Sequence, residues 1–305
     1  MTAIPAAEAR AGNLTGILAM VAGMACFVVN DAFTKLAGAI LPLSEVIVVR
    51  GVMAAVLGFG LAYAMGALRP PREMWRPAVA LRIIGEVGAT LLFLVGLMHM
   101  NFAETNAILQ FAPLLVTAGS SIILKEQVGW RRWTAAFVGL IGVLMIVQPA
   151  GSAFNSYSVL VVLSVLFVAL RDLATRRIPA AIPAMMLTLS SALSVMTAGV
   201  GLSLFETWIS PSPYTLTLLA GAAVFLVGGY YFITIAIRSG EIAVIAPFRY
   251  SIVIFAIITG YFVWGNLPNR LALLGILVVA AAGLYTLHRE RVRMIAERAS
   301  VSSHN

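Results

Sequence analysis

Cysteine and histidine are scarce in this chain, which contains one cysteine and three histidines. The single Cys26 has no second cysteine within the sequence, so neither an internal disulfide framework nor a cysteine-based metal site is predicted. His99, His288 and His304 lie far apart and lack the spacing of metal ligands. We therefore predict no metal and no cofactor.

Charge is also scarce, since Asp, Glu, Lys and Arg make up only 10% of the 305 residues. The sequence lacks a paired-carboxylate metal site, a phosphate-cradling loop, a zinc-protease histidine pair and a nucleophile–base spacing, so no catalytic residue and no enzyme activity are predicted. The net charge is +8, but the bases form short clusters between apolar runs. A nucleic-acid surface would instead show a basic stripe with interleaved aromatics.

Hydrophobic residues are abundant at 61% of the chain, and the mean hydropathy is strongly positive. A soluble domain of this length could not solvate such a surface, so the lipid bilayer is the expected solvent. The first apolar run, from Leu14 to about Ala37, is too long for a signal-peptide core and has no convincing cleavage site. We interpret it as a retained transmembrane helix.

The hydropathy pattern predicts an all-α integral membrane protein with ten transmembrane helices, each near the ~20 residues needed to span a bilayer. The predicted spans are 14–37, 44–66, 78–99, 104–124, 132–148, 157–175, 183–205, 215–237, 241–264 and 269–288. The connections are short and hold no soluble domain. Residues 289–305 form a charged, then Ser-rich tail whose end we expect to be disordered.

Loop charges predict that both termini are cytoplasmic. With the N-terminus inside, fifteen of the twenty Lys and Arg residues fall on the cytoplasmic side, and Arg171, Arg176 and Arg177 are counted among them. The opposite side receives only Lys35 and Arg270. Such an asymmetry sets the orientation of multi-pass proteins.

The chain repeats itself at an offset of about 140 residues. Residues 30–35 (NDAFTK) return as residues 171–176 (RDLATR), with the Asp, the Thr and the final base in register at +141. Three further pairs share this offset: Pro42 with Pro183, Gly58 with Gly199, and Gly88 with Gly229. A membrane chain built from two similar halves usually binds its solute between them, near the bilayer midplane.

The repeat predicts two five-helix units, residues 14–148 and 155–288, followed by a cytoplasmic tail of residues 289–305. Because five is an odd number, the second unit must insert upside-down relative to the first. The pseudo-two-fold axis then lies in the membrane plane, as in inverted-repeat carriers.

Two predicted helices are interrupted by proline at matching positions, which is a sequence pointer to a binding site. Pro247 precedes Arg249 and Tyr250 in the ninth span, and Pro113 follows Gln110 in the fourth. At an offset of 140 residues Gln110 falls opposite Tyr250. Proline removes a backbone hydrogen bond and frees a carbonyl, which is tolerated where a cavity or a neighbour satisfies it.

Charged residues inside the spans are candidates for a functional site, because an unpaired charge in hydrocarbon costs several kcal/mol. Arg249 lies about eight residues, or ~12 Å, into its helix and so near the midplane. It either contacts the solute or pairs with Glu86 to hold helix 9 against helix 3. Glu86 could meet an ammonium or carry a proton, and Arg82 lies one turn before it.

The remaining polar candidates lie nearer the predicted outer face. Arg50 has Glu45 and Asp31 as plausible partners, and a structural or gating pair is favoured over direct solute contact. Asn30 offers both a donor and an acceptor, and it is either an interhelical contact or a solute ligand. Tyr230 and Phe111 have rings that would suit a planar or cationic solute, although lipid-facing aromatics are the commoner case.

The chain resembles the ten-helix branch of the drug/metabolite transporter superfamily, which is built from two EamA-type repeats. The resemblance is carried by Lys35, by Arg50, by Ala103, Ala107, Gln110 and Pro113, by residues 243–250 (AVIAPFRY) and by residues 263–268 (VWGNLP). It implies a central cavity lined mainly by helices 1, 3, 4, 6, 8 and 9. Within the superfamily the chain looks like bacterial amino-acid exporters of the YddG type.

These observations predict an exporter of small, preferably aromatic or neutral amino acids in the bacterial inner membrane, working by alternating access. The predicted substrate-binding residues are Arg249, Tyr250, Glu86, Asn30, Gln110, Phe111 and Tyr230, and the predicted helix-break or gating residues are Pro113, Pro247, Arg50 and Asp31. The alternatives are a proton-coupled multidrug exporter of lipophilic cations or small metabolites, with Glu86 or Asp31 as the coupling acid for cations, and a non-transporting scaffold or receptor-like protein. A monomer is sufficient, and a dimer is not excluded.

Overall fold

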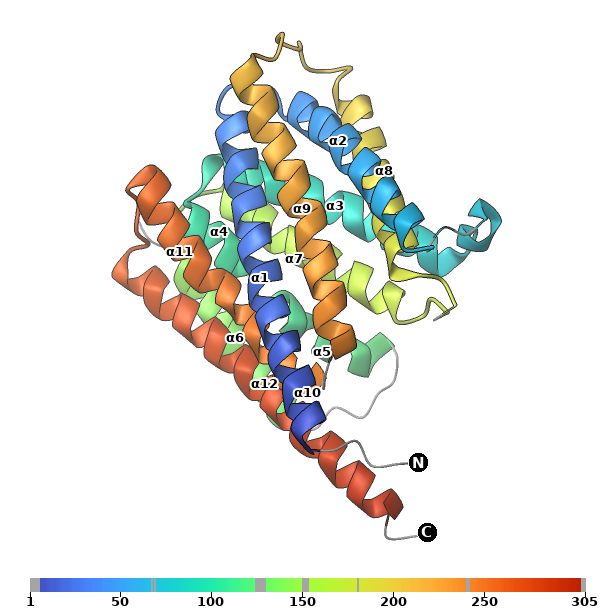
Figure 1. The fold of residues 1–305 in the computed structure, drawn as a ribbon. Helices are drawn as coiled ribbons and strands as arrows, with labels where there is room; N and C mark the ends of the chain where they lie inside the picture. Colours follow the sequence, from blue (N-terminus) through green and yellow to red (C-terminus); the bar gives the residue numbers. More distant parts are fainter. Residues whose placement is uncertain are drawn as a thin grey trace.

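The computed structural model describes residues 6–66, 68, 70–123, 130–149, 154–179, 181–239 and 242–302. Every regular element in this part of the chain is a helix (Figure 1). The first half contains α1 (Ala6–Gly38), α2 (Leu43–Ala64), the 3₁₀ helix η1 (Pro71–Met74), α3 (Pro77–His99), α4 (Phe102–Leu109), α5 (Ala112–Ile123) and α6 (Trp130–Val147). The second half contains α7 (Tyr157–Thr175), α8 (Ala184–Leu202), α9 (Pro213–Ser239), α10 (Ile242–Ile245), the 3₁₀ helix η2 (Ala246–Tyr250), α11 (Ser251–Trp264) and α12 (Arg270–Ser302).

Eight helices within the described residues are long and apolar enough to cross a membrane. They correspond to eight of the ten predicted spans. The predicted span 104–124 is divided between α4 and α5, and the predicted span 132–148 contains a shorter apolar helix, Trp133–Val147. The structure therefore confirms an all-helical membrane protein, whereas the number ten stays a prediction.

Both proline-bearing helices are broken where the sequence predicted. Around Gln110 the backbone hydrogen bonds shorten, because Gln110 N–H donates to the Ala107 carbonyl and Phe111 N–H to the Ile108 carbonyl. Pro113 then occupies the first turn of α5, where its missing N–H costs nothing. Pro247 lies at the start of η2, which separates α10 from α11.

The C-terminal segment differs from the prediction, since α12 continues as one helix to Ser302. Its apolar part ends near Arg289, and the residues after it are mostly strong helix formers such as Arg, Glu, Met and Ala. Their intrinsic propensity favours continuation of the helix instead of disorder. Residues 303–305 of the predicted tail lie outside the described residues.

The long helices pack in pairs that each join one half of the chain to the other. The pairs are α1 with α9, α3 with α7, α2 with α8, and α6 with α12. Figure 1 shows α1 beside α9 along much of their length, and α1 begins at the end of the bundle where α12 ends. An even number of crossings gives this arrangement of the ends.

Glycines allow the backbones of paired helices to approach closely. A Cβ atom at Gly85 of α3 would lie within 2.9 Å of backbone atoms of Arg171 in α7. Gly142 of α6 and Gly275 of α12 face each other in the same way, each next to the other's carbonyl oxygen. Small residues at helix interfaces are typical of membrane bundles, because they permit dense van der Waals contact.

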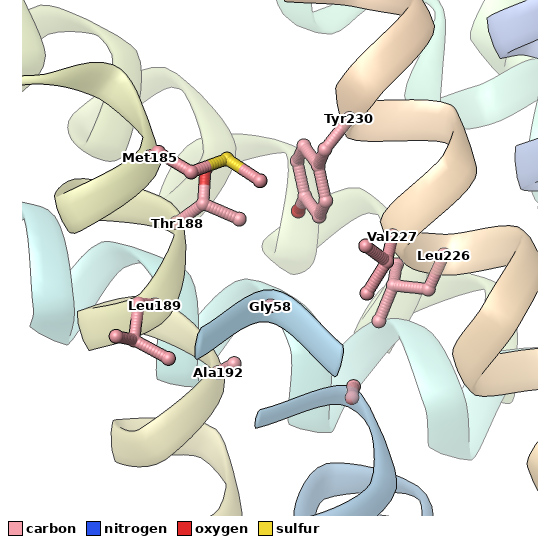
Figure 2. A pocket seen from close by; sticks show the side chains of 9 residues that line it. Gly58, Met185, Thr188, Leu189, Ala192, Leu226, Val227 and Tyr230 are labelled. Carbon is pink, nitrogen blue, oxygen red and sulfur yellow. The ribbon is translucent and has the colours of Figure 1, made fainter. Parts of the chain in front are cut away.

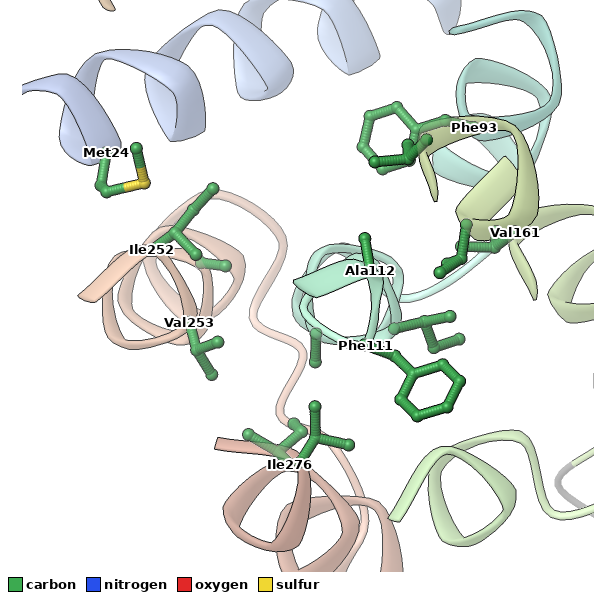
Figure 3. Close-up of a cluster of buried hydrophobic side chains, with 14 of the residues drawn as sticks. Met24, Phe93, Phe111, Ala112, Val161, Ile252, Val253 and Ile276 are labelled. Atoms are coloured by element: carbon green, nitrogen blue, oxygen red, sulfur yellow. The ribbon is translucent and has the colours of Figure 1, made fainter. Parts of the chain in front are cut away.

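The main hydrophobic core surrounds the broken helix α4–α5. Figure 3 shows Met24 of α1 near Ile252 of α11, with Ala112 and Phe111 beside Ile276 and Val161. Met24, Phe93 and Ile252 belong to this core and also line the polar cavity described next.

Candidate functional site

A cavity of about 390 Å³ lies among the helices of both halves. Side chains from α1, α2, α3, α4, α7, α8, α9 and the η2–α11 segment line it. The resemblance implied the predicted helices 1, 3, 4, 6, 8 and 9, which correspond to α1, α3, α4–α5, α7, α9 and α10–α11. Helices α2 and α8 line the cavity in addition. The polar lining residues are Asn30, Asp31, Arg50, Glu86, Thr90, Asn106, Gln110, Arg171, Asp172, Thr188, Ser191, Tyr230 and Arg249. The volume lies in the range of small-molecule pockets.

One polar cluster joins α1 to α2 at the cavity wall. Arg50 Nη1 donates to Thr34 Oγ1 at 3.1 Å and to Asn30 Oδ1 at 3.4 Å. Asn30 Nδ2 in turn donates to Asp31 Oδ1 at 2.9 Å. Both the oxygen and the nitrogen of the Asn30 amide therefore form hydrogen bonds within the protein. This favours the interhelical contact over a role as a free solute ligand.

Glu45 does not act as the partner of Arg50 that the sequence suggested. Its carboxylate is fully buried at the start of α2 and accepts a hydrogen bond from the backbone N–H of Ile209 at 3.0 Å. Trp208 Nε1 donates to Ser44 in the same region. Glu45 thus joins the α8–α9 connection to α2, and Asp31 is the acidic neighbour of Arg50 at the cavity.

A second polar cluster joins α3 to α7. Glu86 forms ion pairs with Arg171 Nη1 at 3.5 Å and with Arg82 Nη2 at 3.8 Å. Arg171 Nε also donates to Asp172 Oδ1 at 2.8 Å. The close approach at Gly85 brings Arg171 within reach of Glu86. Arg82 further donates to Thr175 and to Ser191, so both arginines are held by α3, α7 and α8.

Sequence reasoning missed Arg171 and Asp172 as site residues. Arg171 was counted with the cytoplasmic bases, but it lies inside α7 and lines the cavity. The repeat register contained the signal, since Arg171 and Asp172 are the counterparts of Asn30 and Asp31 at +141. Because Asn30 and Asp31 are candidates in the first half, their counterparts Arg171 and Asp172 are equally candidates in the second.

Arg249 also lines the cavity, half-buried, at the end of η2. The ion pairs of Glu86 are with Arg82 and Arg171, and no carboxylate of a described residue lies within 4 Å of the Arg249 guanidinium. The predicted alternative, a locking pair between Arg249 and Glu86, is therefore not formed here. Arg249 is left as a cation facing the cavity.

The predicted aromatic residues take different positions. Tyr230 lines the cavity, with its ring edge-on to Phe27 at a centroid distance of 5.2 Å. Tyr250 is buried against α12, where a Cβ atom at Gly283 would collide with its hydroxyl. Phe111 is buried against Gly139 of α6 and belongs to the hydrophobic core. Tyr250, Phe111 and the two prolines therefore support the walls without lining the cavity.

A small apolar side pocket of about 20 Å³ adjoins the cavity between α2, α8 and α9. It shares Ala54, Thr188, Ala192, Leu226 and Tyr230 with the main cavity. Figure 2 shows the Tyr230 ring facing Met185 and Thr188 across this pocket. The space suits a group the size of one water molecule or a methyl group.

The far end of α1 is tied to both halves of the chain. Lys35 Nζ donates to the carbonyl oxygens of Leu97 at 2.6 Å and Met100 at 2.5 Å, near the C-terminus of α3. A cation at a helix C-terminus is favourable because of the helix dipole. The same Nζ lies 5.5 Å from the Trp264 ring centroid at the end of α11, and Trp264 stacks on Phe102.

Apolar helices that are long enough to cross a membrane and that enclose a polar cavity are typical of multi-pass membrane proteins that bind a solute. Residues 14–148 match the model of the EamA-like transporter family. Through this match in its first half and through the relatives below, the chain is similar to EamA-type transporters of the drug/metabolite transporter superfamily, which are not enzymes. Among the described residues, no group of three or more His, Cys, Asp and Glu could hold a metal ion.

Several characterised proteins are similar to this chain. An S-adenosylmethionine uptake transporter of Rickettsia prowazekii is 25% identical over 94% of this chain and 97% of its own length. A pseudopaline exporter of Pseudomonas aeruginosa is 25% identical over 88% of this chain and 94% of its own. A riboflavin transporter of Rhizobium johnstonii is 25% identical over 66% of this chain and 67% of its own.

A solved crystal structure has the same fold, with a TM-score of 0.62 and 17% identity over 92% of this chain and 97% of that chain. The matched transporters carry solutes of three different kinds, in both directions. They do not support the narrower resemblance to amino-acid exporters of the YddG type. The transporter class is therefore established, and the solute is a matter for the proposal below.

Proposed function

We propose that this protein carries small amino-acid-type zwitterions out of the cytoplasm through the cavity between two inverted repeats. The observation that carries the proposal is Arg249, a cavity-facing guanidinium with no carboxylate of a described residue within 4 Å. A guanidinium in a low-dielectric cavity binds a carboxylate strongly, and its planar fork matches both carboxylate oxygens. Arg249 would thus hold the substrate carboxylate.

The other arginines of the cavity are less available to bind an anion. Arg171 and Arg82 share Glu86, and Arg50 is hydrogen-bonded to α1 beside Asp31. Arg249 therefore concentrates the uncompensated positive charge of the site. A cavity of about 390 Å³ has room for a solute of amino-acid size with an aromatic or aliphatic side chain.

The names of two relatives supply further compounds to test. S-adenosylmethionine, the solute in the name of a relative matched over nearly the full length, is itself an α-amino acid derivative with an aromatic base. Riboflavin, the solute of another relative, is a flat aromatic compound. Both compounds belong in the first substrate panel, beside phenylalanine.

The helix packing supports two inverted repeats over residues 14–148 and 155–288. Exchanging the halves converts the pair α1–α9 into the pair α7–α3, and it converts α2–α8 and α6–α12 into themselves. At the repeat-related glycines, Gly88 of α3 receives Phe167 of α7, and Gly229 of α9 receives Phe27 of α1. Rocking of such units about a central site is the expected basis of alternating access.

The alternative, an exporter of lipophilic cations, requires a carboxylate free to bind the cation or a proton. Glu86 is shared by two arginines, Asp172 is paired with Arg171, and Asp31 lies beside Arg50 and accepts from Asn30. These contacts favour a zwitterionic or anionic solute over a cation.

The test is counterflow of labelled phenylalanine into liposomes that contain the purified protein, with unlabelled amino acids, S-adenosylmethionine, riboflavin and a lipophilic cation as competitors. We expect saturable exchange that amino acids compete. Arg249→Gln should weaken it about 10- to 100-fold, the effect of losing a hydrogen bond to a charged group. Arg270→Gln is the matched control, since it removes an exposed arginine at the start of α12.

Exchange of the lipophilic cation alone would replace the proposal by the cation exporter. Unchanged exchange in Arg249→Gln would remove Arg249 from the site. The direction is tested separately in cells fed a phenylalanine-containing dipeptide. An exporter raises phenylalanine in the medium relative to cells that carry the empty vector.

A further inference from the structure

Two amide oxygens in the cavity wall have no hydrogen-bond partner. They are Asn106 Oδ1 and Gln110 Oε1, on successive turns of the broken helix α4. Both residues line the cavity, and their exposed fractions are 0% and 4%. A buried acceptor without a donor costs about 1–3 kcal/mol. Two such acceptors on one stretch of wall indicate a position where a ligand supplies the missing donors.

The chemistry of the neighbouring contacts determines which amide atom remains available. Asn106 Nδ2 donates to the Phe102 carbonyl at 3.2 Å, and Gln110 Nε2 donates to the Asn106 carbonyl at 3.4 Å. A carbonyl oxygen accepts only, so each NH₂ group must face its own helix. Both oxygens are thereby left free, and both can only accept.

The helix break makes the Gln110 contact available. Because Gln110 N–H turns to the Ala107 carbonyl, the Asn106 carbonyl loses its usual backbone partner and takes the Gln110 side chain instead. The last carbonyls of α4 also carry the negative end of its dipole. The break therefore gives this part of the wall an acceptor character that favours a cation or an N–H donor.

Two other candidates for an ammonium ligand, Asn30 and Glu86, are already engaged. Asn30 Oδ1 accepts from Arg50, and Glu86 is paired with Arg82 and Arg171. We infer that Asn106 and Gln110 form an acceptor subsite for the ammonium or amine group of the substrate, opposite in polarity to Arg249. This deepens the proposed function and rests on it for the identity of the solute.

The subsite explains how the cavity could select zwitterions. A site built to pair a substrate N–H group rejects an analogue that lacks it, because the buried acceptors are then left unsatisfied. Phenylalanine, its desamino analogue 3-phenylpropanoate and its decarboxylated analogue phenethylamine separate the two polar ends. Arg249 should determine the affinity for compounds with a carboxylate, and the α4 amides should determine the affinity for compounds with an amine.

The experiment measures how these three compounds protect the purified protein against thermal unfolding in nanodiscs, for wild type, Asn106→Leu, Gln110→Met and Arg249→Gln. The double variant Gln148→Met/Asn269→Leu is the matched control, because it removes an exposed amide pair linked at 2.9 Å. We expect both α4 variants to weaken phenylalanine and phenethylamine about 10- to 100-fold. Their affinity for 3-phenylpropanoate should stay at the wild-type value.

Equal weakening of all three compounds would overturn the subsite and make the amides structural. Unchanged binding of the amines would overturn it as well. Should wild type bind phenethylamine through the α4 amides but show no phenylalanine counterflow, the subsite stands and the proposed transport function falls. Absence of any binding by wild type overturns both.

Discussion

At the level of single residues, the cavity is organised by Glu86, which neutralises Arg82 and Arg171 across the α3–α7 interface. Replacing it by Gln leaves the largely buried Arg82 guanidinium without a carboxylate, and it leaves Arg171 with Asp172 alone. Breaking a buried ion pair from one side is strongly destabilising, because the remaining charge is uncompensated. We expect Glu86→Gln to lower the free energy of unfolding by about 2–4 kcal/mol, measured by thermal or denaturant unfolding in detergent.

The double variant Glu86→Gln/Arg82→Gln is the control, since it removes one cation together with the anion and leaves the Arg171–Asp172 pair in place. It should recover part of the lost stability. If Glu86→Gln unfolds like wild type, the two arginines are compensated by water or lipid, and the α3–α7 ion pairs do not hold the cavity together.

At the residue scale, Arg249, Glu86, Asn30, Gln110 and Tyr230 line the cavity, and their role in binding stays a prediction. Tyr250 instead faces α12. Adjacent residues of a helix point about 100–120° apart, so Arg249 and Tyr250 of η2 face different neighbours. The sequence named both residues as candidates, and only the packing of η2 decides which of them faces the cavity.

At the level of helices, the sequence predicted the spans and both breaks, but not which helices are partners. Partner choice depends on close-approach surfaces such as the one between α6 and α12, where Gly142 and Gly275 face each other. A Cβ atom at Gly275 would lie 2.6 Å from the Gly142 carbonyl oxygen. The backbone cannot move aside as a flexible side chain can. A Cβ atom at residue 275 would therefore force α6 and α12 apart.

We therefore expect Gly275→Ala to destabilise the protein by about 1–3 kcal/mol, the usual effect of overpacking. Gly60→Ala in α2 is the matched control, because a Cβ atom there meets nothing within 4 Å. That change should be neutral or slightly stabilising, since Ala favours helix over Gly. Thermal unfolding of both variants in the same detergent makes the comparison, and equal midpoints would show that α6 and α12 pack loosely.

At the level of the whole molecule, the two halves are in contact at the end of the bundle where Lys35 and Trp264 lie. Phe102 at the start of α4 stacks on Trp264 at the end of α11, with ring centroids 5.0 Å apart. The proposed alternating access requires these contacts to separate in one state and to form in the other. A covalent link between α4 and α11 should therefore keep the contacts formed and stop transport.

The test uses Phe102→Cys/Trp264→Cys in a Cys26→Ser background, so that only the introduced thiols can react with a short bifunctional maleimide or disulfide-forming reagent. We expect an oxidatively formed link to abolish phenylalanine counterflow and reduction to restore it, so the same protein serves as its own reference. The pair Ser212→Cys/Thr215→Cys, whose hydroxyl oxygens lie 3.3 Å apart within the second half, is the control. Its link should leave counterflow intact, because both residues move together. If counterflow continues in the protein with the Phe102–Trp264 link, the two halves do not need to separate at this end during transport. The proposed inverted repeats would then have to exchange access by a motion elsewhere in the bundle.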